Sequence, residues 1–242
     1  MKRTSKRFLP QRSHLILYAL ALLVAALFLP ASVMAHKPIF VERNIGGYEQ
    51  AYEIPSPSVS YATYGELKTP RAVDVYKITL TEAAPFYARL SVPKQPQSET
   101  FGPAFVLFGP GLPTTNEPPN YPLDLPPALG RAILLWKGEA DEFYEPFTQT
   151  TYLERQLISK TLEPGTYYIA VYDPAGQSGK YVLATGDQEE FGLSDLIKFP
   201  ATWYKVRMWY NPNQTWLIIA CALAFLLSSL YYLKRIRHRP ED

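Results

Sequence analysis

Residues 216–233 form an unbroken run of eighteen residues without a charged side chain, and this run most limits what the chain can fold into. A helix over this run is roughly 27 Å long at about 1.5 Å per residue, enough to cross the hydrocarbon core of a bilayer. Basic residues follow at once, and such residues favour the cytoplasmic side. We therefore predict a single transmembrane helix over residues 214–233 and a cytoplasmic basic tail over residues 234–242.

A second apolar run lies near the N-terminus and has the features of a secretory signal peptide. Five basic residues precede it, residues 15–29 carry no charge, and small residues surround a cleavage point after Ala35. This order is typical of signal peptides, and fifteen residues are short for a membrane span. We expect residues 1–35 to be a cleaved signal peptide, so that the mature chain begins at His36 and its body lies outside the cytoplasm. An uncleaved signal anchor is the alternative.

Between the two ends, apolar and polar side chains alternate with the period of a β-strand. Eight segments show this pattern or a short apolar run: 59–64, 73–80, 86–92, 104–108, 132–136, 152–162, 167–172 and 179–185. Turns rich in proline and glycine separate these segments, and no amphipathic helix does, which argues against parallel βαβ units. We predict an all-β domain over residues 36–187, built as a sandwich of two antiparallel sheets.

Two hairpins of this domain resemble those of a known family. The segments VDVYKITL at 73–80 and FYARL at 86–90 are similar to the opening hairpin of bacterial pre-peptidase C-terminal domains. The segments EPGTYYIAV at 163–171 and GKYVL at 179–183 are similar to the closing hairpin of that family. The resemblance covers residues 70–187 and implies a jelly-roll-like β-sandwich with an accessory role. Members of this family are appended to secreted enzymes, and some bind carbohydrate, protein fibres or calcium.

A proline-rich insertion interrupts the predicted sandwich. Residues 110–127 contain seven prolines, which stiffen the backbone and favour extended conformations. Two interpretations are open: a semi-rigid binding loop at one end of the sandwich, or a surface excursion without a ligand.

Residues 188–213 differ from the sandwich in composition. Apolar residues recur with charged residues between them, and a plausible helix start is followed by tryptophan, tyrosine, lysine and arginine. We predict an amphipathic juxtamembrane segment that rests on the outer leaflet. A helix packed against the sandwich is the alternative, and the two are compatible.

Charge and histidine content exclude several functions. Residues 36–210 carry 15 Lys and Arg against 20 Asp and Glu, so the basic residues concentrate at the chain ends and no binding to nucleic acid is expected. Of the three histidines, only His36 belongs to the predicted exported part. A Ser-His-Asp triad or a multi-histidine zinc site is therefore excluded, and we predict neither enzymatic activity nor catalytic residues.

Three alternatives use the remaining polar residues. As the mature N-terminus, His36 offers an amine and an imidazole nitrogen that suit copper in a metal-delivery protein. The Asp173 turn, with nearby Asp187 and its acidic neighbours, is a weaker candidate for calcium. A carboxylate-dependent hydrolase would use the acidic cluster Glu139, Asp141, Glu142 and Glu145.

The hypothesis favoured by the sequence is a non-catalytic binding or assembly module, anchored in the membrane of a bacterial-type cell envelope. Its expected partners are the membrane itself and another envelope protein or carbohydrate. Aromatic residues are common at contact surfaces, and the candidate surface consists of Tyr48, Tyr52, Phe143, Tyr144 and Phe147. Tyr61 and Tyr64 are further candidates for this surface, and the alternative is that about half of these aromatic residues fill the core.

Overall fold

The computed structural model describes residues 36–237 except for single positions 44, 115, 147 and 191. The predicted signal peptide, residues 1–35, lies outside the described residues. The chain divides into two compact units. One contains the β-domain and helix α2 and ends at Tyr210, and the other contains helix α3.

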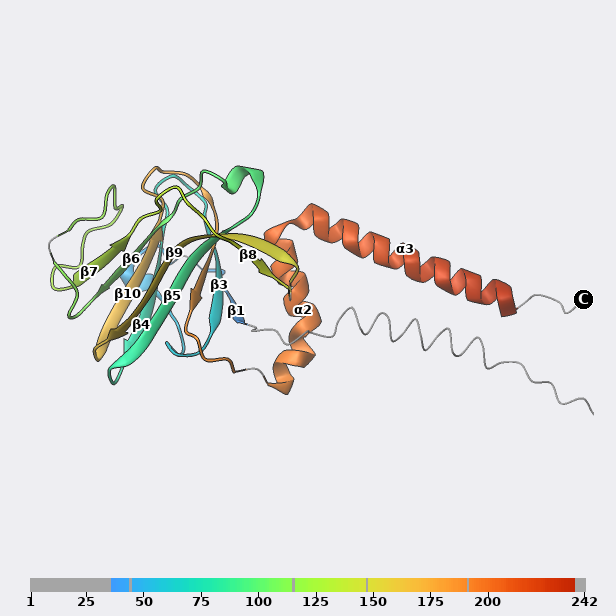
Figure 1. The fold of residues 1–242 in the computed structure, drawn as a ribbon, viewed down its shortest axis with the longest axis horizontal. Coiled ribbons are helices and arrows are strands. Elements are labelled where there is room, and N and C mark those ends of the chain that lie inside the picture. The colour runs from blue at the N-terminus through green and yellow to red at the C-terminus, as the bar shows by residue number, and fades with distance from the viewer. Residues whose placement is uncertain (1–35, 44, 115, 147, 191, 238–242) are drawn as a thin grey trace, which may run out of the picture. The chain divides into compact units, whose positions relative to one another are not determined.

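Two sheets form the β-domain (Figure 1). The six-stranded sheet has the order β1, β3, β11, β5, β9, β8, with the bounds Lys37–Phe40, Tyr61–Leu67, Gly179–Thr185, Ala84–Pro93, Thr150–Leu162 and Glu142–Glu145. The five-stranded sheet has the order β2, β4, β10, β6, β7, with the bounds Tyr52–Glu53, Val73–Leu80, Gly165–Tyr172, Ala104–Gly109 and Gly130–Leu134. Two 3-10 turns, Tyr48–Gln50 and Pro96–Ser98, complete the domain.

The strand order confirms the predicted all-β sandwich. Each of the eight predicted segments overlaps one strand of the order β3-β11-β5-β9 or β4-β10-β6-β7. Within these two groups all pairing is antiparallel, and successive strands alternate between the sheets except at the β6–β7 hairpin. This alternation is the topology of a jelly roll. The short strands β1 and β2 add to the edges in parallel.

The core lies between the two sheets, and β10 shows why its sequence alternates. Tyr167, Ile169 and Val171 point into the core between the sheets. Ala170 and Tyr172 belong to a second buried cluster, on the outer face of the five-stranded sheet. Both faces of this strand are therefore buried, which explains its apolar and aromatic residues at successive positions.

The proline-rich insertion covers the outer face of the five-stranded sheet. Tyr121 and Leu125 of the insertion pack on the second cluster. The Tyr121 hydroxyl lies 2.7 Å from the Tyr48 hydroxyl, and the Tyr172 hydroxyl donates a hydrogen bond of 2.8 Å to the Pro119 carbonyl. Much of the insertion is thus a structural cover for apolar surface.

Helix α2, Leu193–Tyr210, covers the outer face of the other sheet. Val206 and Tyr210 are buried against Tyr64, Tyr152 and neighbouring residues of that sheet. Figure 1 shows α2 beside β1 and β3 and the insertion near β7, on the other side of the sandwich. Within residues 188–213, the structure therefore shows a helix packed against the sandwich, which was the alternative to a segment resting on the outer leaflet.

Helix α3, Pro212–Arg237, is the second unit. Its residues 212–232 have a mean hydropathy of 1.8 and form a helix long and apolar enough to cross a membrane. It is the one helix of this kind among the described residues.

Candidate functional site

An open cleft of about 650 Å³ lies where β3 ends and β4 begins. Its walls come from the segment after β1, from the connection between β3 and β4, from the proline-rich insertion and from α2. Its lining includes Phe40, Tyr64, Gly65, Glu66, Lys68, Arg71, Asp74, Tyr76 and Trp209. Ligand sites commonly have volumes of about 300 to 1,000 Å³, so the cleft is large enough for part of a ligand.

The carboxylate of Asp74 lies partly buried at the base of the cleft. The hydroxyl of Tyr181 donates a hydrogen bond of 2.5 Å to Oδ2 of Asp74, and this hydroxyl also lies 2.7 Å from that of Tyr76. Burial raises the pKa of Asp74, although the bond from Tyr181 and the charge of Lys68 oppose that change. The network joins the two sheets, because Tyr181 is in β11 while Asp74 and Tyr76 are in β4.

Gly65 lets Tyr181 approach the cleft. A Cβ atom at position 65 would lie 2.3 Å from Cζ and 2.5 Å from the hydroxyl oxygen of Tyr181. A real side chain cannot occupy that space unless the tyrosine moves. Glycine at this position therefore keeps the hydroxyl of Tyr181 next to Asp74.

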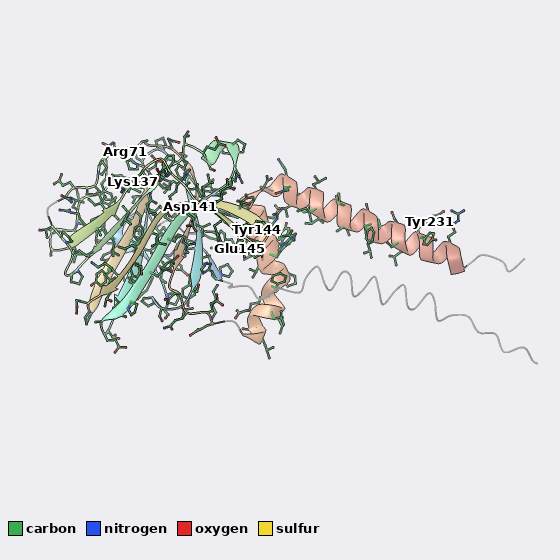
Figure 2. All side chains as sticks on the ribbon, in the orientation of Figure 1. Arg71, Lys137, Asp141, Tyr144, Glu145 and Tyr231 are labelled. Carbon is green, nitrogen blue, oxygen red and sulfur yellow. The ribbon has the colours of Figure 1, made fainter. Side chains whose placement is uncertain are left out.

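The rim of the cleft carries charged side chains of both signs. Glu66, Lys68 and Arg71 are exposed. None of them belongs to the ion pairs found within the described residues, which are Lys37–Glu190, Lys77–Glu53, Arg89–Glu154 and Lys94–Glu142. Figure 2 labels Arg71 at this end of the sandwich. These charges are available to a partner.

One wall of the cleft is aromatic. The rings of Phe40 and Trp209 each lie 5.0 Å from the ring of Tyr64, the first stacked and the second edge-on. The ammonium of Lys180 lies 5.6 Å from the centre of the Trp209 ring and donates a hydrogen bond of 2.6 Å to the Trp209 carbonyl. Phe40 and Trp209 are partly exposed, so they offer apolar surface beside the charged rim.

A neighbouring hollow of about 410 Å³ continues the cleft through the shared residues Arg71, Ala72 and Pro122. Asp173 lies in this hollow and is 6% exposed. Its Oδ1 accepts a hydrogen bond of 2.6 Å from the Ala175 amide, as expected for an aspartate turn. Its Oδ2 is buried and has no hydrogen-bond partner among the described residues.

The acids proposed for calcium lie at different ends of the sandwich. Asp173 precedes strand β11, Gly179–Thr185, and Asp187 follows it. A strand of seven residues is about 20 Å long, so the side chains of Asp173 and Asp187 do not share a site. Within the described residues, no group of three His, Cys, Asp or Glu side chains is placed to hold a metal ion.

His36 lies in a small cavity of about 60 Å³ between the six-stranded sheet and α2. Its Nδ1 is hydrogen-bonded to Oγ of Ser60. Burial, followed by the positive charge of Arg89, lowers the pKa of His36. The cavity also contains Glu145 and Tyr152, but it supplies no further imidazole for a copper site.

The acidic cluster does not converge on one cleft. Glu142 and Glu145 are three residues apart in β8, so their side chains lie on opposite faces of the sheet. Glu142 forms an ion pair with Lys94, whereas Oε2 of Glu145 accepts a hydrogen bond of 2.6 Å from the Thr148 amide. Figure 2 labels Asp141 and Glu145 in this region. The hydrolase alternative therefore lacks the shared cleft that it requires.

The predicted contact aromatics lie in separate places. Tyr48 packs edge-on against Phe108 of the five-stranded sheet, and Tyr52 lies in strand β2 of that sheet with the Arg43 guanidinium over its ring. Phe143 and Tyr144, 37% and 56% exposed, lie in β8 of the other sheet. Phe147 lies outside the described residues. The structure thus does not bring these aromatic residues together.

Comparison with known proteins found two solved structures of low similarity. No family model matches the sequence, and the search of curated proteins found no match. The pre-peptidase C-terminal domain of collagenase from Bacillus anthracis is 16% identical, with a TM-score of 0.32, over 55% of this chain and 91% of that chain. CorA, a surface-associated copper-binding protein of Methylomicrobium album BG8, is 12% identical, with a TM-score of 0.26, over 63% of this chain and 99% of that chain.

The cleft itself was not predicted from the sequence. Its charged residues come from the connection between two strands, where a segment such as Leu-Lys-Thr-Pro-Arg is typical of an ordinary turn. The available signal was the pair of cations, Lys68 and Arg71, on both sides of a proline. That signal is weak, because exposed charges are common in turns.

Proposed function

We propose that this chain is a membrane-anchored, non-catalytic binding module of a bacterial-type cell envelope, and that it holds its partner in the cleft. Residues 1–35 direct export, α3 anchors the chain, and the basic residues after the span stay in the cytoplasm. The observation that carries this proposal is the cleft, because it combines adequate volume, unpaired charges and an aromatic wall.

The chemistry of the cleft favours a polypeptide segment of another envelope protein as the partner. The rim offers the carboxylate of Glu66 beside the cations Lys68 and Arg71, so a partner with charges of both signs can pair with it. The partly exposed rings of Phe40 and Trp209 suit an apolar or aromatic side chain. A neutral glycan would use the rings but would leave the charges desolvated and unpaired.

A binding role suits Asp74 better than a catalytic role. Its carboxylate is engaged by the Tyr181 hydroxyl, and that hydroxyl is held in turn by Tyr76. The three side chains join the two sheets at the base of the cleft. We assign Asp74 to the structural support of the cleft, with no part in proton transfer.

Photo-crosslinking in intact cells tests the proposal. The residue p-benzoylphenylalanine replaces Arg71 at the rim or, as a matched control, Lys160, an exposed lysine of β9 that does not line the cleft. We expect a discrete protein adduct from position 71 that is absent from position 160. Identical products from both positions would contradict the proposal. An adduct with carbohydrate in place of protein would contradict the choice of partner.

A second variant separates binding from folding. Arg71→Glu reverses one rim charge, and Lys160→Glu makes the same change away from the cleft. We expect only the first to reduce recovery of the crosslinked partner, with the crosslinker placed at the neighbouring position Thr69. An equal reduction by both variants would show that charge at the cleft plays no part.

A further inference from the structure

The hollow that continues the cleft has one carboxylate among its described lining residues, and that carboxylate belongs to Asp173. The side chain of Asp173 is buried, and its Oδ1 accepts the hydrogen bond from the Ala175 amide. Its Oδ2 has no hydrogen-bond partner among the described residues. A buried carboxylate with one unpaired oxygen costs free energy, and a cation that reaches it removes that cost.

The described part of the chain supplies no counterion for this carboxylate. Asp173 is absent from the four ion pairs found there. Arg71 also lines the hollow, but its side chain is exposed and belongs to none of these pairs. The charge of Asp173 acts on its neighbour instead: burial is the main cause that raises the pKa of the Tyr172 hydroxyl, and Asp173 raises it further. The hollow therefore favours a positive group from outside.

The walls of the hollow suit an aliphatic chain that ends in a cation. Three rigid, apolar proline rings line it, from Pro70, Pro122 and Pro174. Tyr121 and Tyr172 add two aromatic rings, which lie edge-on with their centres 5.2 Å apart. A lysine side chain buries its carbon stem along such apolar surface while its ammonium reaches a polar group. Aromatic rings also attract an ammonium.

We infer that the hollow takes the side chain of a lysine from the polypeptide that occupies the cleft, with its ammonium at Oδ2 of Asp173. This inference rests on the proposed function, because it specifies one side chain of the proposed partner. The cleft and the hollow share Arg71, Ala72 and Pro122, so a segment in the cleft can extend one side chain into the hollow. Arg71, at this junction, can pair with an acidic residue beside that lysine.

The single free oxygen favours an ammonium over other cations. Calcium takes about six to eight oxygen ligands, and the described lining offers one carboxylate. A guanidinium pairs best when both carboxylate oxygens accept its two parallel N–H groups, but Oδ1 of Asp173 is already engaged by Ala175. An ammonium is a compact charge that needs no such paired arrangement.

Photo-crosslinking of the full chain in intact cells tests the inference, with the crosslinker at Thr69 in the cleft. Asp173→Asn keeps an oxygen that can accept from Ala175 and removes the charge, and Asp187→Asn makes the same change at an exposed aspartate outside the hollow. We expect about tenfold less adduct from the first variant and no change from the second. Equal recovery from both would overturn the inference and leave the proposed function intact. Absence of an adduct from the original chain would overturn both.

Thermal unfolding of the same variants separates this role from a structural one. Removal of an unpaired buried charge should not weaken the free domain, so we expect Asp173→Asn to have a Tm equal to or above that of the original chain. A lower Tm together with the loss of adduct would assign Asp173 to the fold and overturn the inference. Arg71→Gln should change the Tm independently of Asp173→Asn. Coupling between the two in the double variant would make Arg71 the counterion, which would also overturn it.

The captured partner provides the decisive test. Mass spectrometry of the Thr69 adduct identifies the bound segment, in which we expect a lysine. Replacement of that lysine by methionine keeps an unbranched side chain and removes the ammonium. We expect this change to lower adduct recovery about tenfold with the original chain and to cause no further loss with Asp173→Asn. A captured segment without lysine, or equal losses with both chains, would overturn the inference.

Discussion

The hydroxyl of Tyr181 in one sheet donates a hydrogen bond of 2.5 Å to Oδ2 of Asp74 in the other sheet. The bond lies beside the cleft and links its base to both halves of the sandwich. The pKa of Asp74 is raised, and its partial burial is the main cause. We therefore expect the free energy of unfolding of the domain to depend on the protonation of Asp74.

The first prediction concerns this pH dependence. The folded state holds the proton of Asp74 more tightly than the unfolded chain, in which the pKa is 3.8. The proton on Asp74 therefore stabilises the folded state fully below pH 3.8. This contribution to the free energy of unfolding decreases as the pH rises from 3.8 through the raised pKa of the folded state, and it changes no further above that pKa. Asp74→Asn keeps an acceptor for Tyr181 and removes this decrease. Guanidinium unfolding across this range should show a variant that gains stability relative to the original chain as pH rises. If the free energies of unfolding of Asp74→Asn and the original chain changed with pH in parallel, this account of Asp74 would be contradicted.

The second prediction concerns the space at Gly65. In Gly65→Ala the new methyl group meets the ring of Tyr181, which is fully buried and hydrogen-bonded. We expect a loss of about 1–3 kcal/mol in the free energy of unfolding, as is typical of overpacking. Gly47→Ala is the control, because a Cβ there meets only Oε1 of Gln50, at 3.8 Å. Equal stability of the two variants would show that Tyr181 can move freely.

The third prediction concerns the attachment of α2. Arg207→Ala removes the hydrogen bonds to the carbonyls of Thr148 and Gln149, and each charged bond contributes about 1.5–3 kcal/mol. We expect faster hydrogen exchange of the α2 amides while the strands of the core keep their protection. Lys205→Ala changes an exposed cation on the same helix and should leave exchange unaltered. Uniform destabilisation of the whole domain by Arg207→Ala would argue against a separable helix.

The fourth prediction concerns His36. Burial and Arg89 lower its pKa below 6.5, so the unfolded chain takes up the proton more readily than the folded one. The contribution to stability is therefore complete above pH 6.5 and is lost as pH falls from 6.5 through the lowered folded pKa. His36→Gln should remove this part of the acid sensitivity, as measured by thermal unfolding from pH 7 to pH 5. A titration of His36 at 6.5 or above by NMR would contradict the structure.

The copper alternative can be tested on the same residue. Since Nδ1 of His36 is bonded to Ser60 and Arg89 lies nearby, binding of Cu²⁺ would require this arrangement to change. Titration of the mature chain with Cu²⁺, with and without His36→Ala, measures the contribution of this residue. Equal affinities would exclude a copper site at His36.

Much of the sandwich could be predicted because its alternation is regular. The strands that escaped prediction are short or lie at sheet edges. β2 has only two residues, and β8 was interpreted as part of an acidic cluster because Glu142 and Glu145 flank its aromatic pair. Edge strands need fewer apolar residues, since one or both faces contact solvent. Their sequences therefore resemble loops.

The candidate site could not be predicted for a different reason. The cleft joins segments that are far apart in the sequence, such as the end of β1, the connection to β4, and Trp209 of α2. No periodic pattern in the sequence indicates that these segments lie side by side in the fold. Arg207 lies in the segment predicted to rest on the outer leaflet, whereas the fold buries it against the residues just before β9. Such tertiary roles depend on long-range packing and leave no local signal.

Protease accessibility tests most directly the claim that an exported domain is anchored by one C-terminal helix. Cells carrying an epitope tag after Asp242 are made permeable in their outer layers, with the cytoplasmic membrane left intact, and are then treated with protease. The account predicts cleavage within residues 36–210 and survival of a small tagged fragment that contains α3. Complete resistance of residues 36–210 until the cytoplasmic membrane is broken, or loss of the tag before it is broken, would contradict the account.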